Sequence, residues 1–369
     1  MEVTVYDYSR NARILLEDGT EFEGFAFGHE SSAAGEVLFY SGQADIGRLL
    51  LDPSLKDAIL VLTQPICGST GIRDAGVCPF GLETGTEHPT ITIKGLVVGD
   101  YQAPEVFPPQ EKALTRWLRK YQVPGISGID TRALIKKIEQ RGVMRAKIII
   151  DDTRDVSFSS AGKHSHPQYI SVKKRQTYGT GRKKIIAIDC GIKHSALRKL
   201  ITPDTTVIKT PWNDDFRGED FDGVFISGGP GDPTSWDKPI AIIKDLLKGD
   251  RAIFATGQGA VILALAAGGA TYRLGKGHHG SSIPCIDLQT GKCIITAQNH
   301  SYGIREDSLP HEWETTFLEN NSHCIEGIRT RKGLFSGVLF HPEGNPGPSD
   351  AAWLYDDFLK IVIEGGILK

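Results

Sequence analysis

Apolar and polar side chains alternate early in the chain in a way that predicts β-strands. Residues 12–16 and 21–27 alternate on either side of Glu17-Asp18-Gly19, which is the pattern of a two-stranded hairpin. Shorter runs rich in β-forming residues follow at 36–40, 58–62 and 90–98.

Two segments of the same region have helical spacing instead. Apolar side chains recur at helical intervals over 111–121 and 131–141. Asp130 is placed to cap the second helix, and Gly142 to end it. Together with the strands, these helices predict a mixed α/β domain over residues 1–150.

Residues 151–183 differ in composition from the segments on either side. They are poor in large apolar residues and rich in Ser, Lys, Arg, His and Gly, so they cannot bury enough apolar area to fold alone. Basic clusters at 173–175 and 182–184 lack interleaved aromatic residues, which favours a solvated linker over a nucleic-acid patch.

From residue 184 to 369, strands and helices alternate. Near-uniformly apolar strands are predicted at 184–189, 206–209, 223–227 and 252–256. Helical segments ending at Leu200 and covering 239–247 and 260–267 separate them. This alternation predicts a flavodoxin-like parallel sheet covered on both faces, with ligands at the carboxyl ends of its strands.

Composition and charge narrow the functional classes. The chain has 369 residues, which suggests two domains, and a formal net charge of −3, which argues against a nucleic-acid binder. No apolar run approaches the ~18 residues of a membrane span, and the start of the chain lacks the pattern of a secretory signal. Six cysteines without CxxC spacing predict reduced thiols, a cytoplasmic protein, and no zinc or disulfide scaffold.

Three segments of the C-terminal half could carry chemistry. The glycine-rich loop at 228–233 follows a strand, so its backbone N–H groups could bind an anion or an oxyanion, or the loop could be only a tight turn. The segment 254–260 has the outline of a nucleophile elbow, yet Gly257 at the nucleophile position has no side chain. His341 and Glu343 suit a base whose imidazole is oriented by a carboxylate.

A set of motifs in fixed order resembles the small, glutaminase subunit of carbamoyl-phosphate synthase, a class I glutamine amidotransferase. The C-terminal motifs are Asp189-Cys190-Gly191-Ile192-Lys193, Gly229-Pro230-Gly231-Asp232-Pro233, Gly277-His278-His279-Gly280, Thr296-Ala297-Gln298-Asn299-His300 and His341-Pro342-Glu343. Those of the N-terminal half are Leu16-Glu17-Asp18-Gly19-Thr20, Gly35-Glu36-Val37, Asp52-Pro53-Ser54 and Gly128-Ile129-Asp130-Thr131-Arg132. The likeness covers about residues 12–365.

This resemblance implies a function and a partner. Such a subunit hydrolyses glutamine with a Cys-His-Glu triad and passes ammonia to a large subunit. The large subunit holds ATP and Mg²⁺ and makes carbamoyl phosphate for pyrimidine or arginine biosynthesis. The resemblance implies no cofactor or metal in this chain. It places His341 and Glu343 as base and orienter, and the following residues as contacts for L-glutamine: Ser54, Gly229, Gly231, Gln258, Val261, Asn299, Ser301 and Tyr302.

The elbow departs from the family pattern Gly-Ile-Cys-Leu-Gly-His-Gln. Gly257 stands at the position of the catalytic Cys, and Val261 at that of the Gln that holds the substrate. Residues 41–47 and the pair Ser301-Tyr302 are altered as well. The ammonia-dependent, urea-cycle type of synthetase resembles this chain in having lost the Cys. Because a thioester needs a thiolate, we predict that glutaminase activity is absent or severely impaired.

Three hypotheses remain open from the sequence. The chain is a structural and allosteric subunit of an ammonia-using synthase, a glutaminase that uses a non-standard thiol, or a free-standing binding or regulatory protein. Cys190 ends a predicted strand near the site, but a packing role is the simpler interpretation. His278 and His279 should point in opposite directions in an extended segment and therefore not share a metal.

Overall fold

The computed structural model describes residues 10–73, 76–102, 111–151, 153–158 and 167–365. Its N-terminal half is a closed β-barrel with the strand order β1-β11-β3-β4-β7-β10-β2. The barrel strands are β1 (Asn11–Leu16), β2 (Glu21–Gly28), β3 (Ala33–Tyr40), β4 (Ala58–Leu62), β7 (Gly95–Val97), β10 (Pro124–Ser127) and β11 (Met144–Ile150).

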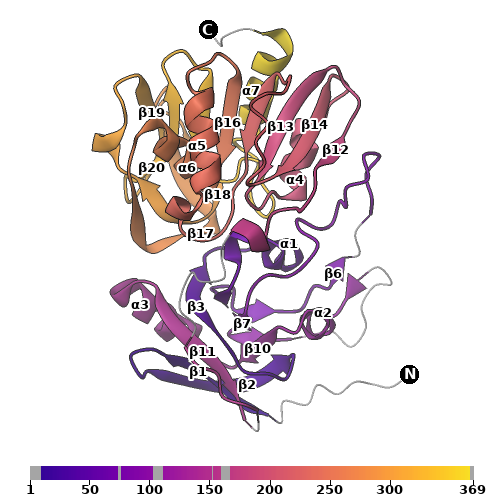
Figure 1. The fold of residues 1–369 in the computed structure, drawn as a ribbon. Helices are drawn as coiled ribbons and strands as arrows, with labels where there is room; N and C mark the ends of the chain where they lie inside the picture. Colours follow the sequence, from indigo (N-terminus) through magenta and orange to yellow (C-terminus); the bar gives the residue numbers. More distant parts are fainter. Residues whose placement is uncertain (1–9, 74–75, 103–110, 152, 159–166, 366–369) are drawn as a thin grey trace.

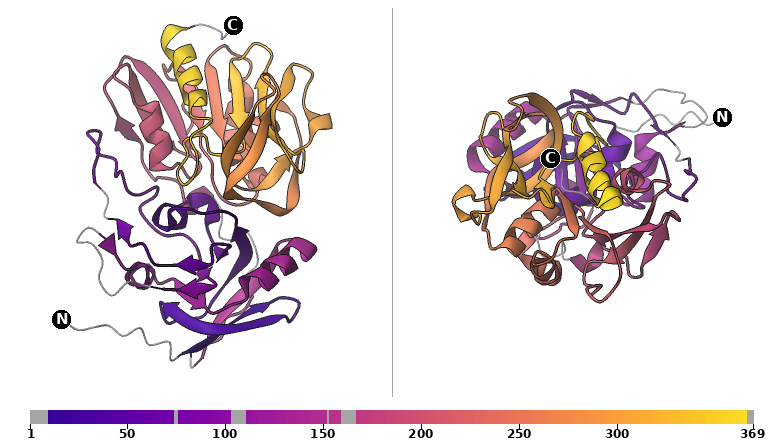
Figure 2. Two further views of the ribbon diagram at one scale, coloured as in Figure 1. Left: turned by 180° about the vertical axis from the view of Figure 1, so that it is seen from behind. Right: turned by 90° about the horizontal axis from the view of Figure 1, so that it is seen from above.

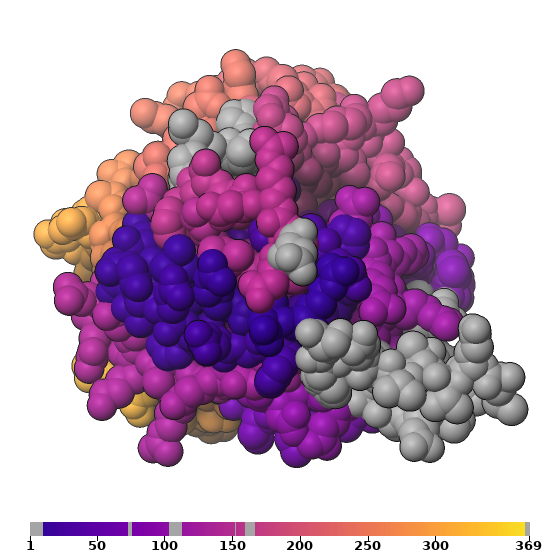
Figure 3. Space-filling model, turned by 90° about the horizontal axis from the view of Figure 1, so that it is seen from below, coloured from indigo at the N-terminus to yellow at the C-terminus, as the bar shows by residue number. Residues whose placement is uncertain are grey.

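Helices and short strands complete this half. The helices are α1 (Ile46–Leu50), the 3₁₀ helix η1 (Pro53–Leu55), α2 (Leu114–Lys120) and α3 (Thr131–Arg141). Two small sheets pair β5 (Ile66–Cys67) with β8 (Asp100–Tyr101), and β6 (Ile72–Arg73) with β9 (Glu111–Lys112). Seen from below, the surface is formed mainly by residues of the N-terminal half (Figure 3).

The structure confirms the predicted hairpin, since β1 and β2 pair antiparallel. It also confirms the helix at 131–141, where the Asp130 side chain accepts a hydrogen bond from the amide of Ala133, and Gly142 follows with φ +82°. The strand predicted at 90–98 is wrong in length, because only Gly95–Val97 pairs with its neighbours. The helix predicted at 111–121 begins three residues later, at Leu114.

The C-terminal half contains one ten-stranded sheet with the order β12-β14-β13-β15-β16-β21-β20-β19-β17-β18. Five neighbouring strands are parallel: β14 (Thr205–Pro211), β13 (Lys183–Asp189), β15 (Gly223–Ile226), β16 (Ala252–Thr256) and β21 (Phe335–Val338). The others join antiparallel: β12 (Gln176–Tyr178), β17 (Thr271–Asp287), β18 (Cys293–Ile304), β19 (Trp313–Glu319) and β20 (Ile325–Thr330).

The predicted parallel sheet is confirmed for these five strands, and the antiparallel strands make the sheet as a whole a mixed one. Antiparallel sheets commonly have one face in contact with solvent, so their strands do not show the uniformly apolar pattern by which a buried parallel strand is recognised. The segment proposed as a linker, 151–183, contributes the 3₁₀ helix η2 (Pro167–Tyr169) and the edge strand β12. Its Ile170 is buried in an apolar core.

Helices cover both faces of the parallel strands (Figures 1 and 2). Helices α5 (Asp237–Leu246) and α6 (Gln258–Ala267) pack on one face, while α4 (His194–Leu200) and α7 (Trp353–Glu364) pack on the other. Two more 3₁₀ turns are η3 (Pro233–Ser235) and η4 (Glu306–Ser308). Because α6 is apolar on nearly all sides, it is almost completely buried. Among the described residues, no helix has both the length and the apolar character that crossing a membrane requires.

The carboxyl ends of the parallel strands face the N-terminal half, and the two halves are in contact there. A Cβ added at Gly191, after β13, would lie 3.1 Å from Cβ of Pro53 in η1. The backbone of Ser41, after β3, exchanges hydrogen bonds with the β17 residues His279 and Ser281. The loops after β13, β15, β16 and β21 therefore meet where the two halves join.

Candidate functional site

The turn between β16 and α6 has the geometry of a nucleophile elbow. Gly257 stands between the strand and the helix with φ +55° and ψ −132°. A Cβ placed on it would lie 3.9 Å from Nε2 of His341 and 3.1 Å from Cα of Gly228. A side chain at this position would therefore point at the imidazole, and positive φ makes glycine the least strained occupant.

His341 is held for use as a base. Its backbone amide donates to the carbonyl of Ala297 at 2.8 Å, and its Nδ1 lies 3.0 Å from Oε1 of Glu343. Because an ionised carboxylate only accepts hydrogen bonds, Nδ1 carries the proton and Nε2 carries the lone pair. Nε2 is buried and has no hydrogen-bond partner among the described residues, so it is free to accept a proton at the elbow.

Glu343 is ionised because the ammonium group of Lys193 and the hydrogen-bond donors of His341 and Tyr355 surround it. Lys193 Nζ lies 2.7 Å from Oε1, and the hydroxyl of Tyr355 donates to Oε2 at 3.2 Å. Burial alone would raise the pKa of Glu343, but Lys193 and His341 outweigh burial and hold the pKa well below its usual range. The carboxylate therefore fixes the tautomer and the orientation of the imidazole.

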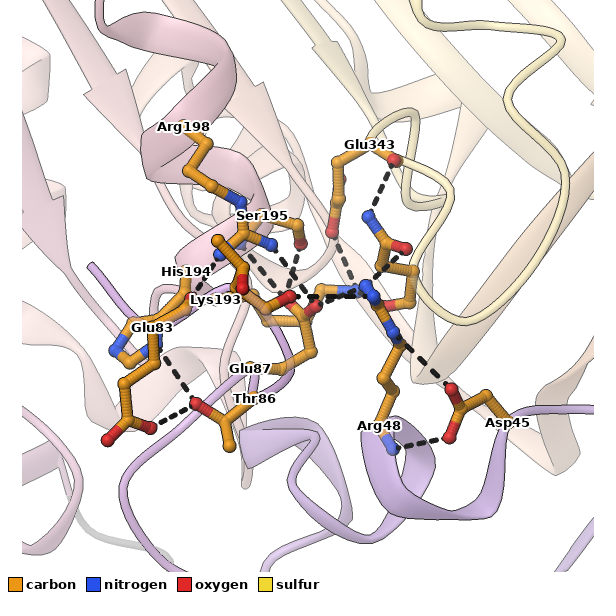
Figure 4. A network of polar contacts seen from close by, with 12 residues as sticks. Asp45, Arg48, Glu83, Thr86, Glu87, Lys193, His194, Ser195, Arg198 and Glu343 are labelled. Carbon is orange, nitrogen blue, oxygen red and sulfur yellow. Dashed lines mark hydrogen bonds and ion pairs between the residues drawn. The ribbon is translucent and has the colours of Figure 1, made fainter. Parts of the chain in front are cut away.

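Lys193 connects this pair to the N-terminal half (Figure 4). Its ammonium group donates to the carbonyl of Asn345 at 2.8 Å and lies 3.9 Å from the carboxylate of Asp52. Burial opposes its charge, yet Glu343, Asp52 and Glu87 raise the pKa of Lys193 above its ordinary value. The base–orienter pair therefore depends on an ion network that spans both halves of the molecule.

Sequence reasoning missed Lys193, Asp52, Glu87 and Tyr355. A signal existed for the first two, since Lys193 closes the motif Asp189-Cys190-Gly191-Ile192-Lys193 and Asp52 opens Asp52-Pro53-Ser54. Neither motif indicates that a lysine after β13 reaches a glutamate that lies 150 positions further along the chain. Nothing in the local sequence distinguishes Glu87 or Tyr355.

The glycine-rich loop after β15 lies beside the elbow. A Cβ on Gly229 would come within 1.9 Å of the carbonyl oxygen of Cys190, so only glycine fits there. Gly231 has φ +84°, which also favours glycine. The side-chain amide of Gln258 donates to the carbonyl of Pro230 at 2.9 Å and fixes the loop to the first turn of α6.

Two of the residues predicted to contact glutamine, Asn299 and Ser301, lie together around His279. Asn299 is buried beside the ion network, where its amide donates to Asp52 at 3.1 Å and its Oδ1 accepts from His279 at 2.7 Å. The hydroxyl of Ser301 lies 3.3 Å from the other nitrogen of that imidazole. Burial lowers the pKa of His279 to about 4, so it is neutral and joins the two residues.

Ser54, Tyr302 and Val261 lie in different surroundings. Ser54 is half-buried in η1, and its amide donates to Asp52 at 2.9 Å. Tyr302 is half-buried on β18, and burial together with Asp232 raises its pKa. Val261 lies one turn after Gly257 and is only 1% exposed within the apolar core around α6.

Cys190 is a poor substitute nucleophile. Its side chain is fully buried after β13, and its amide donates to the hydroxyl of Ser227 at 2.9 Å. Burial raises the pKa of its thiol well above the ordinary value. Because the thiolate is the nucleophilic form, this cysteine is inert at neutral pH.

Comparison with known proteins gives the family. A family model described as "Carbamoyl-phosphate synthase small chain, CPSase domain" matches residues 14–148, and one described as "Glutamine amidotransferase class-I" matches residues 186–361. The chain is 34% identical to "Carbamoyl phosphate synthase small chain" of Pyrococcus furiosus, over 95% of this chain and 97% of the relative. The chain belongs to the carbamoyl-phosphate synthase small chain family.

Other relatives of this family member are much longer. It is 36% identical to "Carbamoyl-phosphate synthase [ammonia], mitochondrial" of Homo sapiens, over 97% of this chain but 24% of that protein. It is also 36% identical to "Multifunctional protein CAD" of Squalus acanthias, over 95% of this chain and 16% of that protein. The chain thus spans about a quarter or less of these two relatives.

Proposed function

We propose that this chain is the small-chain part of an ammonia-using carbamoyl-phosphate synthase. It provides structure and allosteric coupling and does not release ammonia from glutamine itself. Its partner is a large synthase chain, which would hold ATP and Mg²⁺ and make carbamoyl phosphate from ammonia and bicarbonate. The product would serve pyrimidine or arginine biosynthesis, and the proposed location is the cytoplasm.

The observation that carries this proposal is the empty nucleophile position in an otherwise assembled elbow. His341 and Glu343 are in place, and Nε2 of His341 faces Gly257, where there is no atom beyond the backbone to attack glutamine. Such a base can accept a proton from water but cannot form a thioester. In a protease example, loss of the nucleophile from a triad lowers turnover by about 10⁶-fold.

Support also comes from the relatives. The human relative carries "[ammonia]" in its name, and this chain is similar to it over 97% of its length. We assign domain boundaries to the chain at 1–150 for the small-chain domain, 151–183 for the connection and 184–369 for the amidotransferase-like domain.

The decisive experiment reconstitutes the chain with a large synthase chain. Carbamoyl phosphate formation is measured with ammonium chloride or with glutamine as the nitrogen source. We expect ammonia to support synthesis and glutamine to give no more than background. Glutamine turnover within tenfold of an ordinary glutaminase subunit would overturn the proposal, and Cys190→Ser would then show whether that thiol is responsible.

The same preparation tests the free-standing alternative. We expect the two chains to elute together in size-exclusion chromatography at micromolar concentration, because a stable interface of this kind buries about 1,200–2,000 Å². Clean separation of the chains would favour a binding or regulatory protein that acts alone.

A further inference from the structure

Two histidines face each other across the hairpin of β17 and β18. His278 and His300 are directly opposite in the register of the two strands, and the centroids of their rings are 5.2 Å apart. Side chains alternate between the two faces of a strand, so this pair lies on the face opposite to His279 and Asn299, which belong to the candidate site. The predicted opposite orientation of His278 and His279 is thus confirmed, and His278 has partners of its own.

Glu326 on β20 lies against both of these imidazoles. Its Oε1 is 2.9 Å from Nδ1 of His278, and its Oε2 is 3.3 Å from Nε2 of His300. The carboxylate is completely buried, and the two imidazoles are the only basic groups within 4.0 Å of it in the part of the chain that the structure describes. A buried carboxylate needs a positive charge beside it, because it has lost its hydration. The three side chains can each offer one metal-ligand atom, all within 4.8 Å of one another.

The hydrogen bonds around His300 orient Nε2 toward the carboxylate. Nδ1 of His300 lies 2.9 Å from the carbonyl oxygen of Tyr302, so Nδ1 carries a proton and donates it. In the neutral ring, Nε2 therefore has the lone pair, and it faces Oε2 of Glu326 and Oε1 of Gln298, the latter at 3.3 Å. These atoms are three acceptors without a donor between them. A second proton, on Nε2, would satisfy Gln298 but leave Oε2 of Glu326 without a hydrogen bond among the described residues.

The chemistry and the spacing of these groups suit zinc. Two imidazole nitrogens and one carboxylate are an established set of protein ligands for Zn²⁺, with water at the fourth position. Bonds of about 2.0–2.2 Å place tetrahedral ligand atoms about 3.4 Å apart. The observed separations of 2.9 Å and 3.3 Å between Glu326 and the two imidazoles are therefore close to those that an ion requires. The hydrogen bond from Nδ1 of His300 to a backbone carbonyl is also typical of metal-binding histidines, since it fixes the ring and its tautomer.

We propose that His278, His300 and Glu326 form a binding site for a divalent metal ion of the zinc type. The ion joins the hairpin of β17 and β18 to β20, and it supplies the positive charge that the buried carboxylate needs. The side chain of His278 is 12% exposed, so the ion and its bound water have access from that side. Sequence analysis considered His278 only together with His279, whereas the three ligands come from three different strands.

The test titrates ZnCl₂ into the intact chain, which is purified without a histidine tag, treated with EDTA and then dialysed free of the chelator. Calorimetry measures the affinity and the number of ions bound, and a thermal scan measures the melting temperature. We expect one ion per chain and a melting temperature that rises by about 5 °C or more at saturating zinc. The absence of binding, or a dissociation constant above about 1 mM, would show that a proton and not a metal ion holds the three side chains together. Either result would overturn the proposal.

Variants locate the bound ion. We expect His278→Gln to weaken zinc binding by at least about tenfold and to abolish the rise in melting temperature. His311→Gln is the matched control, because His311 is an exposed histidine outside the cluster, and this variant should bind zinc as the wild type does. Glu326→Gln removes the charge while keeping the shape of the side chain, and the same loss is expected. If this buried variant fails to fold, His278→Gln still decides, since His278 is partly exposed. Zinc binding that survives in His278→Gln would place the ion elsewhere and overturn the proposal.

A second measurement identifies the type of ligand atom. Co²⁺ replaces Zn²⁺ in the same titration, and its absorption spectrum distinguishes nitrogen and oxygen ligands from thiolates. We expect the spectrum of a nitrogen–oxygen site without an intense thiolate-to-cobalt charge-transfer band. Such a band would show that a cysteine, such as the exposed Cys293, binds the ion, and it would overturn the assignment of the ligands. Both measurements are independent of glutamine hydrolysis, so the proposed function can fail without affecting this proposal.

Discussion

Gly257 combines the two properties that decide the chemistry of the elbow: its φ of +55° and its place beside His341. A backbone in this region costs a non-glycine residue on the order of 1–3 kcal/mol. An active nucleophile would have to bear that strain, whereas glycine bears none. Glycine at this position thus avoids the backbone strain of the turn, and it also leaves the elbow without a nucleophile to attack glutamine.

We predict that Gly257→Cys alone does not restore glutamine hydrolysis. The new thiol would reach His341, but Val261 cannot hydrogen-bond the substrate, and an unmatched polar group in a dry site costs roughly 1–3 kcal/mol. We expect the double variant Gly257→Cys/Val261→Gln to exceed the product of the two single effects. Steady-state hydrolysis rates of wild type, both singles and the double provide the measurement.

Gly257→Ala is the matched control, because it adds the same backbone strain without a thiol. Ordinary glutaminase rates from Gly257→Cys alone would show that the glutamine site is intact. Val261 lies in the apolar core, so we expect Val261→Gln by itself to lower the unfolding free energy by about 1–3 kcal/mol.

The ion network around Glu343 predicts a dependence of stability on pH. Its folded-state pKa is lowered, so its contribution is complete above the unfolded value near pH 4.5 and is lost as the pH falls through the folded value. We expect Glu343→Gln to flatten the decline in unfolding free energy between about pH 5 and pH 2. Urea unfolding across this range measures the effect.

Glu364→Gln provides the comparison, because Glu364 is exposed at the end of α7. Its profile should follow that of the wild type. If Glu343→Gln has the same acid dependence as the wild type, the ion network with Lys193 does not stabilise the folded state in the way described.

Individual strands and helices could be predicted from the sequence where a local pattern of apolar and polar residues marks them. The strand predicted at 58–62 is β4, and that at 252–256 is β16, because both are short and mostly apolar runs. The closure of the barrel by β1 with β11 depends on a pairing between segments far apart in the sequence, which no local pattern encodes. The strands β17 and β18 are neighbours in the sequence, but the glycines and the proline within β17 interrupt the alternation by which a strand is recognised, so this antiparallel part of the second sheet was not predicted.

Helix α3 tests one such local signal. Asp130 accepts a hydrogen bond from the amide of Ala133 at 2.9 Å, which satisfies an otherwise unpaired donor of the first turn. We expect Asp130→Ala to lower the unfolding free energy by about 0.5–2 kcal/mol. Lys136→Ala, at an exposed position in the middle of the same helix, should change it by less than about 0.5 kcal/mol. If both variants lower the unfolding free energy equally, the Asp130 side chain does not stabilise α3 as a cap.

For the whole molecule, the contact between the two halves is what assembles the candidate site. Residues of the N-terminal half supply Asp52 and Glu87, and residues of the C-terminal half supply Lys193 and Glu343. The sequence motifs identified His341 and Glu343 because the two residues are neighbours. They could not identify the buried partners from the other half, because that contact forms only after both halves have folded.

Substitution of Glu87 can test the contact between the N-terminal and C-terminal halves. Its carboxylate accepts from the amide and the hydroxyl of Ser195 at 3.0 Å and 2.5 Å, and Arg48 and Arg198 lie 3.2 Å and 3.6 Å from it (Figure 4). Burial raises the pKa of Glu87 above its ordinary value, although Lys193, Ser195 and Arg198 oppose this effect. Its removal leaves several donors unpaired at the junction.

We therefore expect Glu87→Ala to weaken the docking of the two halves, at a cost of about 1–3 kcal/mol for a buried donor left unpaired. The junction should open before either half unfolds, so thermal unfolding should begin earlier and limited proteolysis should cut between the halves more readily. Glu83→Ala is the control, since Glu83 is exposed and its carboxylate contacts only Thr86 among the interactions that the structure describes. Identical melting and proteolysis of the two variants would mean that the halves are held together by their other contacts, such as the Ser41 bridge to β17 and the Arg273–Glu36 ion pair.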